Sequence, residues 1–473
     1  MREKYESLPV GQLKAVAKHR GIKGLAKMKK HEVVEAMLQL DEEEKEGHSV
    51  KSEKENKPIR TEKENKSLQT EKESHTSGSE SAQMREMAEP EEKIPPQYDD
   101  AKVADGILEV MQDGYGFIRC ENYLPGENDV YVSPSQIRKF NLKTGDIIYG
   151  KTRKNNPTDK FGALLFIENI NGFDPDYAAK RPNFEDLTPI FPNQRLRLER
   201  PGGSVAARIV DLISPIGKGQ RGMIVSQPKA GKTTLLKDVA KSIKLANPDM
   251  HLIILLIDER PEEVTDMKET IEGGNVEVIY STFDELPEHH KRVAEMVIER
   301  AKRLVEHGKD VMVLLDSITR LTRAYNLTVT PSGRTLSGGL DPAALHMPKR
   351  FFGAARNMRE GGSLTVLATA LVETGSKMDD IVFEEFKGTG NMELLLDRKL
   401  SEKRVFPAID LSRSSTRRED LLLNHEEQEA ADIIRKGLNG LKKDDAAETI
   451  LNLFAHTKTN REVCEQVVRK RVL

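Results

Sequence analysis

The sequence predicts a multidomain protein, in which a small all-β barrel lies between an N-terminal helical unit and a large α/β core with a parallel sheet. Three observations predict this class. Short strand-like segments separated by turns fill residues 101–170. From about residue 175, unbroken apolar runs alternate with amphipathic stretches. The chain has 473 residues, enough for about two to four domains.

Residues 1–40 are predicted to form the N-terminal helical unit. Leu8, Leu13 and Val16 lie at helical spacing, and apolar residues recur in the same way over 33–38. Three lysines lie in the turn between these two stretches. The pattern is compatible with a small helical bundle that has a solvated face, and equally with a weak nucleic-acid-binding module.

Residues 41–96 are predicted to be a disordered, charged linker. Between Asp41 and Lys93 the chain has 16 acidic and 10 basic residues, and it has no aromatic residue up to Pro96. Such a stretch buries too little apolar surface to offset the entropy of ordering. It contains an imperfect nine-residue repeat, Ser52–Arg60, Thr61–Gln69 and Thr70–Gly78. The acidic excess of this stretch is larger than the net charge of −3 of the whole chain, so the remaining residues together have a net positive charge.

Composition excludes several classes of protein. The two cysteines, Cys120 and Cys464, are too few for a disulfide scaffold or a cysteine-based zinc site. No run of about 18 apolar residues predicts a membrane span, and no signal-peptide core is visible near the start. We therefore expect a cytoplasmic protein with no membrane partner.

The barrel is predicted over residues 97–172. Gly-, Asn- and Pro-bearing turns separate short segments of strand-forming residues. Five such strands in about seventy residues are typical of an OB-fold. The expected strands are Ile107–Met111, Gly116–Arg119, Asp129–Val132, Asp146–Lys151 and Leu164–Ile170.

One strand of this barrel has a pattern typical of single-stranded nucleic-acid binding. Tyr115 and Phe117 share a face because side chains alternate along a strand, and Arg119 continues that face. Tyr131 on the next strand could join them. Aromatic rings stack on bases and arginine supplies charge, so we favour RNA binding. The alternative is that one of these rings fills the barrel core.

The α/β core is predicted over residues 173–420, and residues 421–473 are predicted to be helical. Unbroken apolar strands joined by amphipathic helices indicate a parallel sheet that is covered on both faces. The apolar runs are Met223–Val225, Leu252–Ile257, Val311–Leu315 and Leu364–Leu371, and the amphipathic stretches include Thr233–Ile243 and His290–Val305.

A phosphate-binding loop is predicted at Ser226–Thr233. It follows a short apolar strand and opens an amphipathic stretch, which is the context that a P-loop requires. Gly231 permits close approach of the backbone to a phosphate, Lys232 can reach the β- and γ-phosphates, and Thr233 can hold Mg²⁺. Ser226 replaces the first glycine of the usual pattern. A chance match is the alternative, and the order of strand, loop and helix disfavours it.

Carboxylates follow two of the predicted strands. Asp316 ends one apolar run, the place for an aspartate that holds Mg²⁺. Asp258 and Glu259 end another, at the sheet edge where open parallel sheets bind ligands. A carboxylate there could orient or deprotonate a water that attacks the γ-phosphate. Spacing alone does not choose between Asp258 and Glu259, and Glu259 could instead pair with Arg260.

These motifs together resemble the Rho family of bacterial transcription termination factors. The residues that carry the resemblance are Gly219–Thr233, Asp258–Val264, Pro348–Arg356, Gly375–Asp379 and Glu384–Glu393. It extends from about residue 101 to the C-terminus, and the N-terminal helical unit also resembles that of the family. The acidic repeat segment departs from the compact family pattern, which puts its linker role in doubt.

The resemblance implies a homohexameric ring of RecA-like P-loop NTPase subunits, with ATP bound between subunits and an OB or cold-shock-type barrel that captures RNA. It implies an RNA-dependent ATPase, a helicase that moves 5′ to 3′ on single-stranded RNA and releases it from RNA polymerase. Transcription elongation factors are further candidate partners. The expected cofactors are ATP and Mg²⁺.

The resemblance also assigns residues. It places Glu259 as the catalytic carboxylate, Arg417 as an arginine finger and Phe406 as the ring that stacks on adenine. The residues expected to bind ATP are Lys229, Ala230, Gly231, Lys232, Thr233, Thr234, Arg260, Arg404 and Phe406; Thr233 and Asp316 are expected to hold Mg²⁺, and Lys232, Glu259 and Arg417 to act in catalysis. The residues expected to bind RNA are Tyr115, Phe117, Arg119, Asp129, Tyr131, Arg334 and Lys377.

Two glycine-bearing segments resemble the pore loops of the family. Thr330–Gly339 contains Arg334, and Gly375–Met378 contains Lys377. Flexible loops with isolated cations suit the tracking of an RNA backbone. By sequence alone they could equally be solvent loops, so their place in a pore depends on the resemblance.

Two other functions compete with an RNA translocase. One is a rotary or secretion-type ATPase subunit, which the aromatic barrel argues against. The other is an RNA chaperone with a vestigial nucleotide site, which the set Lys232, Thr233, Glu259, Asp316 and Arg417 argues against. Stimulation of ATP hydrolysis by single-stranded RNA would separate the three.

Overall fold

The computed structural model describes residues 29–31, 33–34, 102–153, 160–438 and 443–470. The chain divides into two compact units, Met1–Pro90 and Glu91–Leu473, and the second contains the elements discussed below. The predicted helical unit 1–40 lies almost wholly outside the described residues, and the predicted linker 41–96 lies wholly outside them. Both therefore stay predictions.

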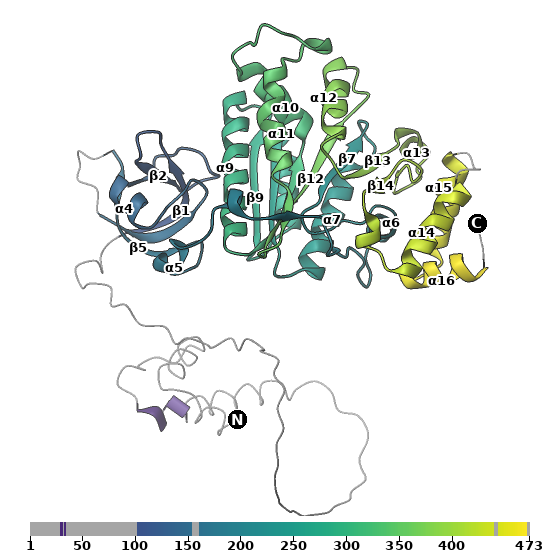
Figure 1. Ribbon diagram of the computed structural model, residues 1–473, viewed down its shortest axis with the longest axis horizontal. Coiled ribbons are helices and arrows are strands. Elements are labelled where there is room, and N and C mark those ends of the chain that lie inside the picture. Colours follow the sequence, from purple (N-terminus) through teal and green to yellow (C-terminus); the bar gives the residue numbers. More distant parts are fainter. Residues whose placement is uncertain (1–28, 32, 35–101, 154–159, 439–442, 471–473) are drawn as a thin grey trace, which may run out of the picture. The chain divides into compact units, whose positions relative to one another are not determined.

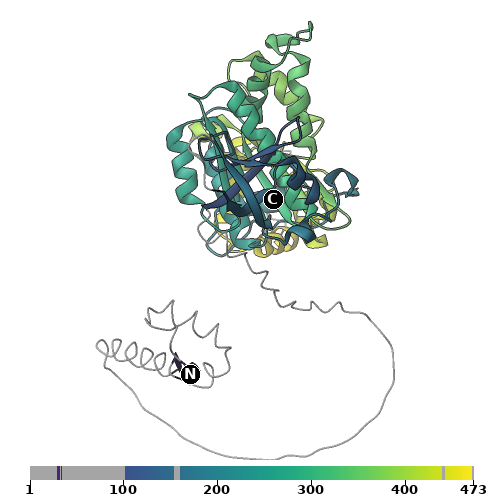
Figure 2. The ribbon, with the colours of Figure 1, turned by 90° about the vertical axis from the view of Figure 1, so that its left-hand side faces the viewer.

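The barrel is a closed sheet, as the sequence predicts, and it faces the viewer in Figure 2. Its strand order is β1-β2-β3-β5-β4. Buried aliphatic side chains fill it, among them Leu108, Ile118, Val132 and Ile148. Strands β3 and β5 pair in parallel, and all other pairs are antiparallel. The strands are β1 (Lys102–Val110), β2 (Gly116–Arg119), β3 (Val130–Val132), β4 (Ile147–Thr152) and β5 (Gly162–Ile170).

A short helix, α4 (Pro134–Lys139), connects β3 to β4. A capping box begins it: the Ser133 hydroxyl accepts a hydrogen bond from the Gln136 backbone N–H, and the Gln136 side-chain oxygen accepts one from the Ser133 backbone N–H. Pro134 occupies the first turn, where its missing N–H is no loss. The loop after α4 approaches the α/β core.

The α/β core is one sheet in the order β14-β13-β7-β12-β10-β8-β9. Along this order all pairs from β13 to β9 are parallel and β14 pairs antiparallel at one edge; β11 pairs antiparallel with β12, and β6 with β11. The strands are β7 (Arg221–Ser226), β8 (His251–Glu259), β9 (Val276–Thr282), β10 (Asp310–Asp316), β12 (Ser363–Leu371), β13 (Met392–Leu396) and β14 (Ser415–Thr416); the short β6 (Pro189–Ile190) and β11 (Arg356–Met358) pair beside β12.

Helices cover both faces of this sheet, as unbroken apolar strands predict (Figure 1). Alternate residues of each strand face opposite layers: Ile224 and Ile254 pack with one set of helices, Val225 and Ile253 with the other. The first set contains α6 (Val205–Ile213), α7 (Lys232–Ala246), α8 (Pro261–Thr270), α14 (His425–Leu438), α15 (Lys443–Ala455) and α16 (Asn460–Lys470); the second contains α9 (Pro287–Glu306), α10 (Ile318–Thr328), α11 (His346–Gly353) and α12 (Lys377–Lys387).

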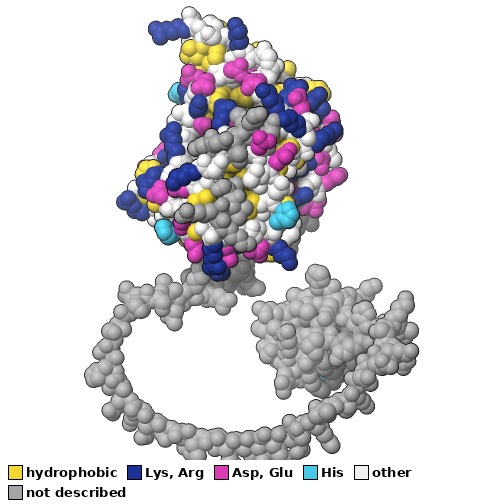
Figure 3. All heavy atoms as spheres, turned by 90° about the vertical axis from the view of Figure 1, so that its right-hand side faces the viewer, with side chains coloured by type: hydrophobic (Ala, Val, Ile, Leu, Met, Phe, Trp, Pro, Cys, Tyr) yellow, Lys and Arg dark blue, Asp and Glu magenta, His cyan; other side chains and the backbone are white. Residues whose placement is uncertain are grey.

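The C-terminal helices are held to α6 by a buried arginine. The Arg208 guanidinium donates to the backbone oxygens of Phe454 and Thr457, at 2.9 and 2.7 Å. Its burial lowers the pKa of Arg208, and nearby Glu199 opposes that shift. On this side of the molecule, basic and acidic side chains are intermixed and no single sign predominates (Figure 3).

The barrel docks against the outer edge of the core sheet and the helix α9. The Arg181 guanidinium bridges Asp146 of the barrel and Glu306 of α9, at 2.7 and 2.8 Å, and all three side chains are buried. The Asn122 side chain makes two hydrogen bonds to the backbone of Tyr280 in β9, at 2.7 and 3.2 Å. Barrel and core are therefore joined by specific, desolvated contacts.

Candidate ATP site and RNA-binding surfaces

The P-loop is formed by the turn from β7 into α7. Gly231 has a φ of +93°, the left-handed region in which a residue with a Cβ is strained, and it is the N-cap of α7. No atom lies within 4 Å of the Cβ position at Gly231, so the space in front of the helix is open. The N-terminal amides of α7 therefore face a cavity of 820 Å³ that can receive an anion.

The Lys232 ammonium lies between the two predicted carboxylates. Its Nζ is 3.0 Å from Glu259 Oε1 and 2.5 Å from Asp316 Oδ1. The Thr369 hydroxyl donates a further hydrogen bond to Asp316, at 2.8 Å. The sheet order explains this convergence, because β8, β10 and β12 are neighbours and all end at the same edge.

Burial and neighbouring charges together determine the ionisation of Lys232 and Glu259. Desolvation raises the pKa of Glu259, and the charge of Asp316 raises it further, while Lys232 opposes both. Desolvation acts against the Lys232 ammonium, but Asp316 and Glu259 together raise the pKa of Lys232 above its usual value. The site thus holds a charged lysine beside a carboxylate that takes up a proton more readily than usual.

The structure separates the two rival acidic residues after β8. Glu259 is buried and faces Lys232, whereas the Asp258 carboxylate turns to Arg320, 3.0 Å away. Asp258 also has a φ of +58°, which sets the two side chains apart. Arg260, which follows, is an exposed residue at the start of α8 and lines the same cavity. Asp258 and Glu259 both line the cavity, and of the two Glu259 contacts the P-loop lysine.

Of the two predicted metal ligands, Thr233 lines the ATP cavity, whereas Asp316 is buried behind it and contacts Lys232. The Thr233 hydroxyl is at the cavity wall and donates to Glu263 Oε2 at 3.4 Å. Within the described residues, no three His, Cys, Asp or Glu side chains could hold a metal by themselves. One hydroxyl and one or two carboxylates are the protein ligands expected for Mg²⁺ that binds together with phosphates.

A second hollow adjoins the P-loop on the side away from the carboxylates. It has a volume of 430 Å³ and shares Gly231 and Thr234 with the lining of the ATP cavity. Phe406 lines it and is half exposed, with Val205 among the apolar residues opposite. The predicted adenine-stacking ring is therefore next to the phosphate loop, where an aromatic base could reach it.

Two predicted arginines lie away from the cavity of their own chain. Arg417 follows the edge strand β14, is exposed, and is not part of the cavity wall. Burial lowers the pKa of Arg221, and the positive charges of Arg356 and Arg417 lower it further. Arg404 is exposed with a φ of +63° and likewise lies outside the cavity wall. Within one chain, neither forms part of the ATP site.

On the barrel, the predicted rings form one cluster at the surface. Tyr115, Phe117 and Tyr131 are partly exposed, and their ring centroids lie 5.8 to 6.1 Å apart. None belongs to the buried core of the barrel, so the core-filling alternative is wrong. Phe161, which we did not predict, extends the cluster with a centroid 5.2 Å from Phe117. The sequence pattern did not reveal Phe161, because it lies just before the last strand of the barrel and is remote in sequence from the other three rings.

Arg119 and Asp129 differ from expectation, because neither lies open on this surface. Arg119 is 6% exposed; its guanidinium pairs with Glu109 at 2.6 Å and with Asp129. It also lies 4.9 Å from the centre of the Phe117 ring. The alternation of side chains placed Arg119 on the correct face but could not reveal these acidic partners. Asp129 and Glu109 thus hold Arg119 against the Phe117 ring.

The two glycine-bearing loops lie side by side. A short 3₁₀ turn, η4 (Ser337–Gly339), packs on the start of α12, so closely that a Cβ at Gly338 would come within 2.6 Å of the Met378 nitrogen. Arg334 and Lys377, one in each loop, are both exposed. Arg323 of α10 anchors the second loop through two hydrogen bonds to Asp379, at 2.8 and 2.6 Å. Arg323 and Asp379 also line the ATP cavity.

The fold and the site define an ATP hydrolase of the RecA-like P-loop class that has an RNA-binding barrel in the same chain. The RNA-binding domain family of Rho termination factor matches residues 104–176, and the nucleotide-binding domain of the ATP synthase alpha/beta family matches residues 206–416. Transcription termination factor Rho of Pseudomonas aeruginosa is 57% identical over 371 residues, which cover 77% of this chain and 88% of that protein. The Escherichia coli K12 protein of the same name is 57% identical over 370 residues, with the same shares. The chain belongs to the Rho family.

Solved structures support the core fold. A prototypical ATPase of a type III secretion system aligns over 68% of this chain and 94% of its own, with a TM-score of 0.52 and 22% identity. The assembled type III secretion ATPase EscN of enteropathogenic E. coli aligns over 68% of this chain and 79% of its own, with a TM-score of 0.51 and 20% identity. Within the described ranges, no helix is long and apolar enough to cross a membrane.

Proposed function

We propose that this protein is a transcription termination factor: an RNA-dependent ATPase that moves 5′ to 3′ along nascent single-stranded RNA and releases it from RNA polymerase. The observation that carries the proposal is a complete phosphate site and an exposed aromatic cluster in one compact unit. The relatives that match over most of the chain bear this function in their name. Because transcription takes place in the bacterial cytoplasm, a protein with this function would act there.

In this proposal Lys232 and the amides at the start of α7 bind the β- and γ-phosphates of ATP. When the phosphates enter, the Lys232 ammonium exchanges its contacts with Glu259 and Asp316 for phosphate oxygens. Thr233 and Asp316 would then hold Mg²⁺, which supplies charge neutralisation on the phosphates. Lys229, Ala230, Thr234 and Arg260 complete the pocket wall around the nucleotide.

Glu259 is the proposed catalytic carboxylate. Once Lys232 turns to the phosphates, the buried Glu259 carboxylate is free to orient a water and accept its proton. Its raised pKa favours proton uptake, which a general base requires. Asp258, in contrast, is neutralised by Arg320 and has no such role.

A homohexameric ring is the proposed assembly. The exposed Arg417 and Arg404 are outside the cavity of their own chain, so they are available to a neighbour's nucleotide. An arginine that reaches an adjacent γ-phosphate contributes about 10³- to 10⁵-fold in rate in related phosphoryl-transfer enzymes. Arg334 and Lys377, on two adjacent exposed loops, would line the ring's channel and contact the RNA backbone.

The direct test measures ATP hydrolysis by the full chain with and without a C-rich single-stranded RNA. We expect strong stimulation by RNA, and little stimulation by duplex DNA of the same length. Hydrolysis that is independent of RNA would instead favour a secretion-type ATPase, the class of the solved structures that share the core fold. RNA binding without hydrolysis would favour the chaperone alternative.

A further inference from the structure

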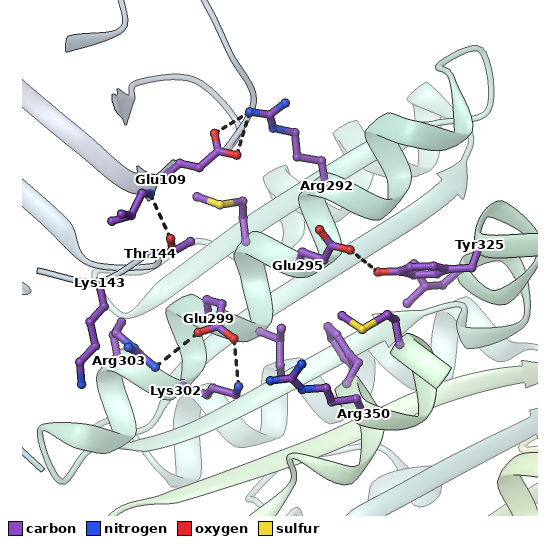
Figure 4. A pocket seen from close by; sticks show the side chains of 16 residues that line it. Glu109, Lys143, Thr144, Arg292, Glu295, Glu299, Lys302, Arg303, Tyr325 and Arg350 are labelled. Carbon is purple, nitrogen blue, oxygen red and sulfur yellow. Dashed lines mark hydrogen bonds and ion pairs between the residues drawn. The ribbon is translucent and has the colours of Figure 1, made fainter. Parts of the chain in front are cut away.

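A further cavity, separate from the ATP cavity and the hollow at Phe406, lies between the barrel and the helices α9, α10 and α11 (Figure 4). Its volume is 470 Å³, and it shares no lining residue with the ATP cavity. Strand β1 and the loop before β4 form one wall, and the three helices form the other. None of the proposed catalytic or RNA-binding residues lines it.

One end of this cavity is strongly basic. The side chains of Lys143, Lys302, Arg303 and Arg350 lie around Glu299, while the other two lining carboxylates, Glu109 and Glu295, lie farther along the cavity (Figure 4). Glu299 accepts from Lys302 at 2.9 Å and from Arg303 at 3.4 Å. Glu306 and Glu185, which also pair with these cations, lie behind the wall rather than in it. Among the described residues, Arg350 forms no ion pair, and it is exposed.

Two guanidinium groups in the wall have an unused donor. The Nε atoms of Arg303 and Arg292 are buried and have no hydrogen-bond partner among the described residues. The Arg303 side chain is only 6% exposed, so bulk water does not satisfy it. Burial lowers the pKa of Lys143, and the charges of Arg303 and Arg181 lower it further against the opposing Glu306. Arg303, with Lys143 and Lys302 beside it, therefore favours an anion at this end of the cavity, whereas Arg292 pairs with Glu109 away from this end.

The rest of the cavity has a different chemistry. Met296, Leu321, Met347 and Phe351 supply an apolar surface. Beyond it lies the Glu295 carboxylate, which accepts from the Tyr325 hydroxyl at 2.8 Å and has further acceptor capacity. Glu109 stands at the same end. A fatty acid would place its tail against these carboxylates, whereas a ligand with hydroxyl or amino groups would donate to them.

We propose that this cavity binds a nucleoside phosphate, with the phosphate between Arg303 and Arg350 and the sugar and base across the apolar surface toward Glu295. A free nucleotide and a nucleotide of bound RNA share this chemistry, and either could occupy the cavity. Because the ligand would touch β1 and α9 at once, it would join the barrel to the core. The inference is independent of the proposed reaction, because it concerns binding at a separate site.

The test is equilibrium dialysis of the full chain with radiolabelled ADP. Lys232→Ala removes the main phosphate contact of the P-loop, so any second class of sites stays visible in this variant. We expect residual ADP binding that Arg350→Ala, added to Lys232→Ala, weakens at least tenfold and that Arg350→Lys weakens less. Arg359→Ala is the matched control, because it removes an exposed arginine outside the cavity. Equal melting temperatures of the variants confirm that the fold is intact.

Addition of single-stranded RNA distinguishes the two sources. If RNA supplies the nucleotide, RNA displaces the residual ADP, or RNA affinity itself falls with Arg350→Ala. If a free nucleotide is the ligand, residual ADP binding depends on Arg350 and is unchanged by RNA. The proposal is overturned if Arg350→Ala changes neither residual ADP binding nor RNA affinity.

Discussion

At the scale of single residues, the ATP site is organised by one lysine between two buried carboxylates. Lys232 compensates Glu259 and Asp316 in the absence of phosphate, so removing it leaves two uncompensated buried acids. The sequence could predict all three residues, because each directly follows a recognisable strand or opens a helix. It could not choose between Glu259 and Asp258, since that choice depends on backbone torsions and on Arg320.

Lys232→Ala should abolish ATP hydrolysis while leaving capture of RNA on the barrel largely intact. The reason is that the two sites belong to different parts of the molecule: the phosphate loop follows β7 of the core sheet, whereas the aromatic cluster lies on β2 and β3 of the barrel. ATPase assays and filter binding with long RNA measure the two effects. Lys241→Ala, on the same helix but outside the cavity, is the control. Loss of RNA binding by a folded Lys232→Ala protein would contradict the separation.

The raised pKa of Glu259 predicts the pH dependence of hydrolysis. A general base must be deprotonated, and burial together with Asp316 makes Glu259 protonate at a higher pH than an ordinary glutamate. The rate should therefore fall as the pH is lowered through this raised pKa, and recover as the pH rises again. Glu259→Gln should lower the rate about 10²- to 10⁴-fold and remove this acid limb, with ATP affinity retained. A low rate that keeps the same acid limb would assign the limb to another group.

Replacing Tyr115 and Phe117 together by Ala should weaken binding of long RNA by about 2–4 kcal/mol, if each ring stacks on one base. Tyr131 and Phe161 remain in the cluster, so some affinity should persist. Tyr177→Ala is the matched control, because Tyr177 is an exposed ring that packs against Phe173 instead. Fluorescence anisotropy gives the affinities. A fall in melting temperature with unchanged affinity would make the rings structural.

At the scale of elements, the strands of the barrel and the buried core strands β7, β8, β10 and β12 were predictable because their apolar patterns are strong, whereas the partly buried β9 and the two-residue β14 were not. The packing of one loop against another was not. Thr330–Gly339 and Gly375–Met378 each looked like a solvent loop, and only the tertiary structure brings η4 onto the start of α12. The burial of Arg119 was equally hidden, because it requires Glu109 from β1 and Asp129 before β3.

Gly338→Ala should disturb the paired loops without affecting RNA capture. Gly338 has a φ of +73°, and its Cβ would lie 2.6 Å from the Met378 nitrogen, which cannot yield as a flexible side chain would. Gly333→Ala is a close control, because Gly333 has a similar φ of +77° but no atom within 4 Å of its Cβ position. We expect RNA-stimulated ATP hydrolysis to fall several-fold more in Gly338→Ala than in Gly333→Ala. Equal effects would mean that backbone strain alone matters and that the loop contact does not.

At the scale of the whole molecule, the arginine finger that the family resemblance assigns lies outside the ATP cavity of its own chain. Lys232 and Glu259 line the P-loop cavity, whereas Arg417 follows the edge strand β14 and does not line it. A neighbouring subunit could supply this arginine, and the sequence suggested that arrangement only through the family resemblance.

Arg417→Ala should bind ATP nearly normally and hydrolyse it about 10³- to 10⁵-fold more slowly. Mixing experiments test whether it acts in trans. Rings doped with Arg417→Ala subunits should lose activity faster than the mutant fraction rises, because each mutant disables its neighbour's site. Arg418→Ala, which removes the adjacent exposed arginine, is the control. A strictly linear decline in rings shown to exchange subunits would sink the trans assignment.

The two hydrogen bonds from Asn122 to Tyr280 have a consequence for the solubility of any shortened version of this protein. Strand β9 is the last strand of the core sheet, and its outward backbone groups at Tyr280 are occupied by an amide side chain from the barrel. An uncovered edge strand offers a template for pairing with another chain. A core fragment that lacks the barrel would expose this edge, together with the groove that the buried Tyr123 fills. Such a fragment should therefore self-associate through β9, and the barrel protects the core from aggregation as well as capturing RNA.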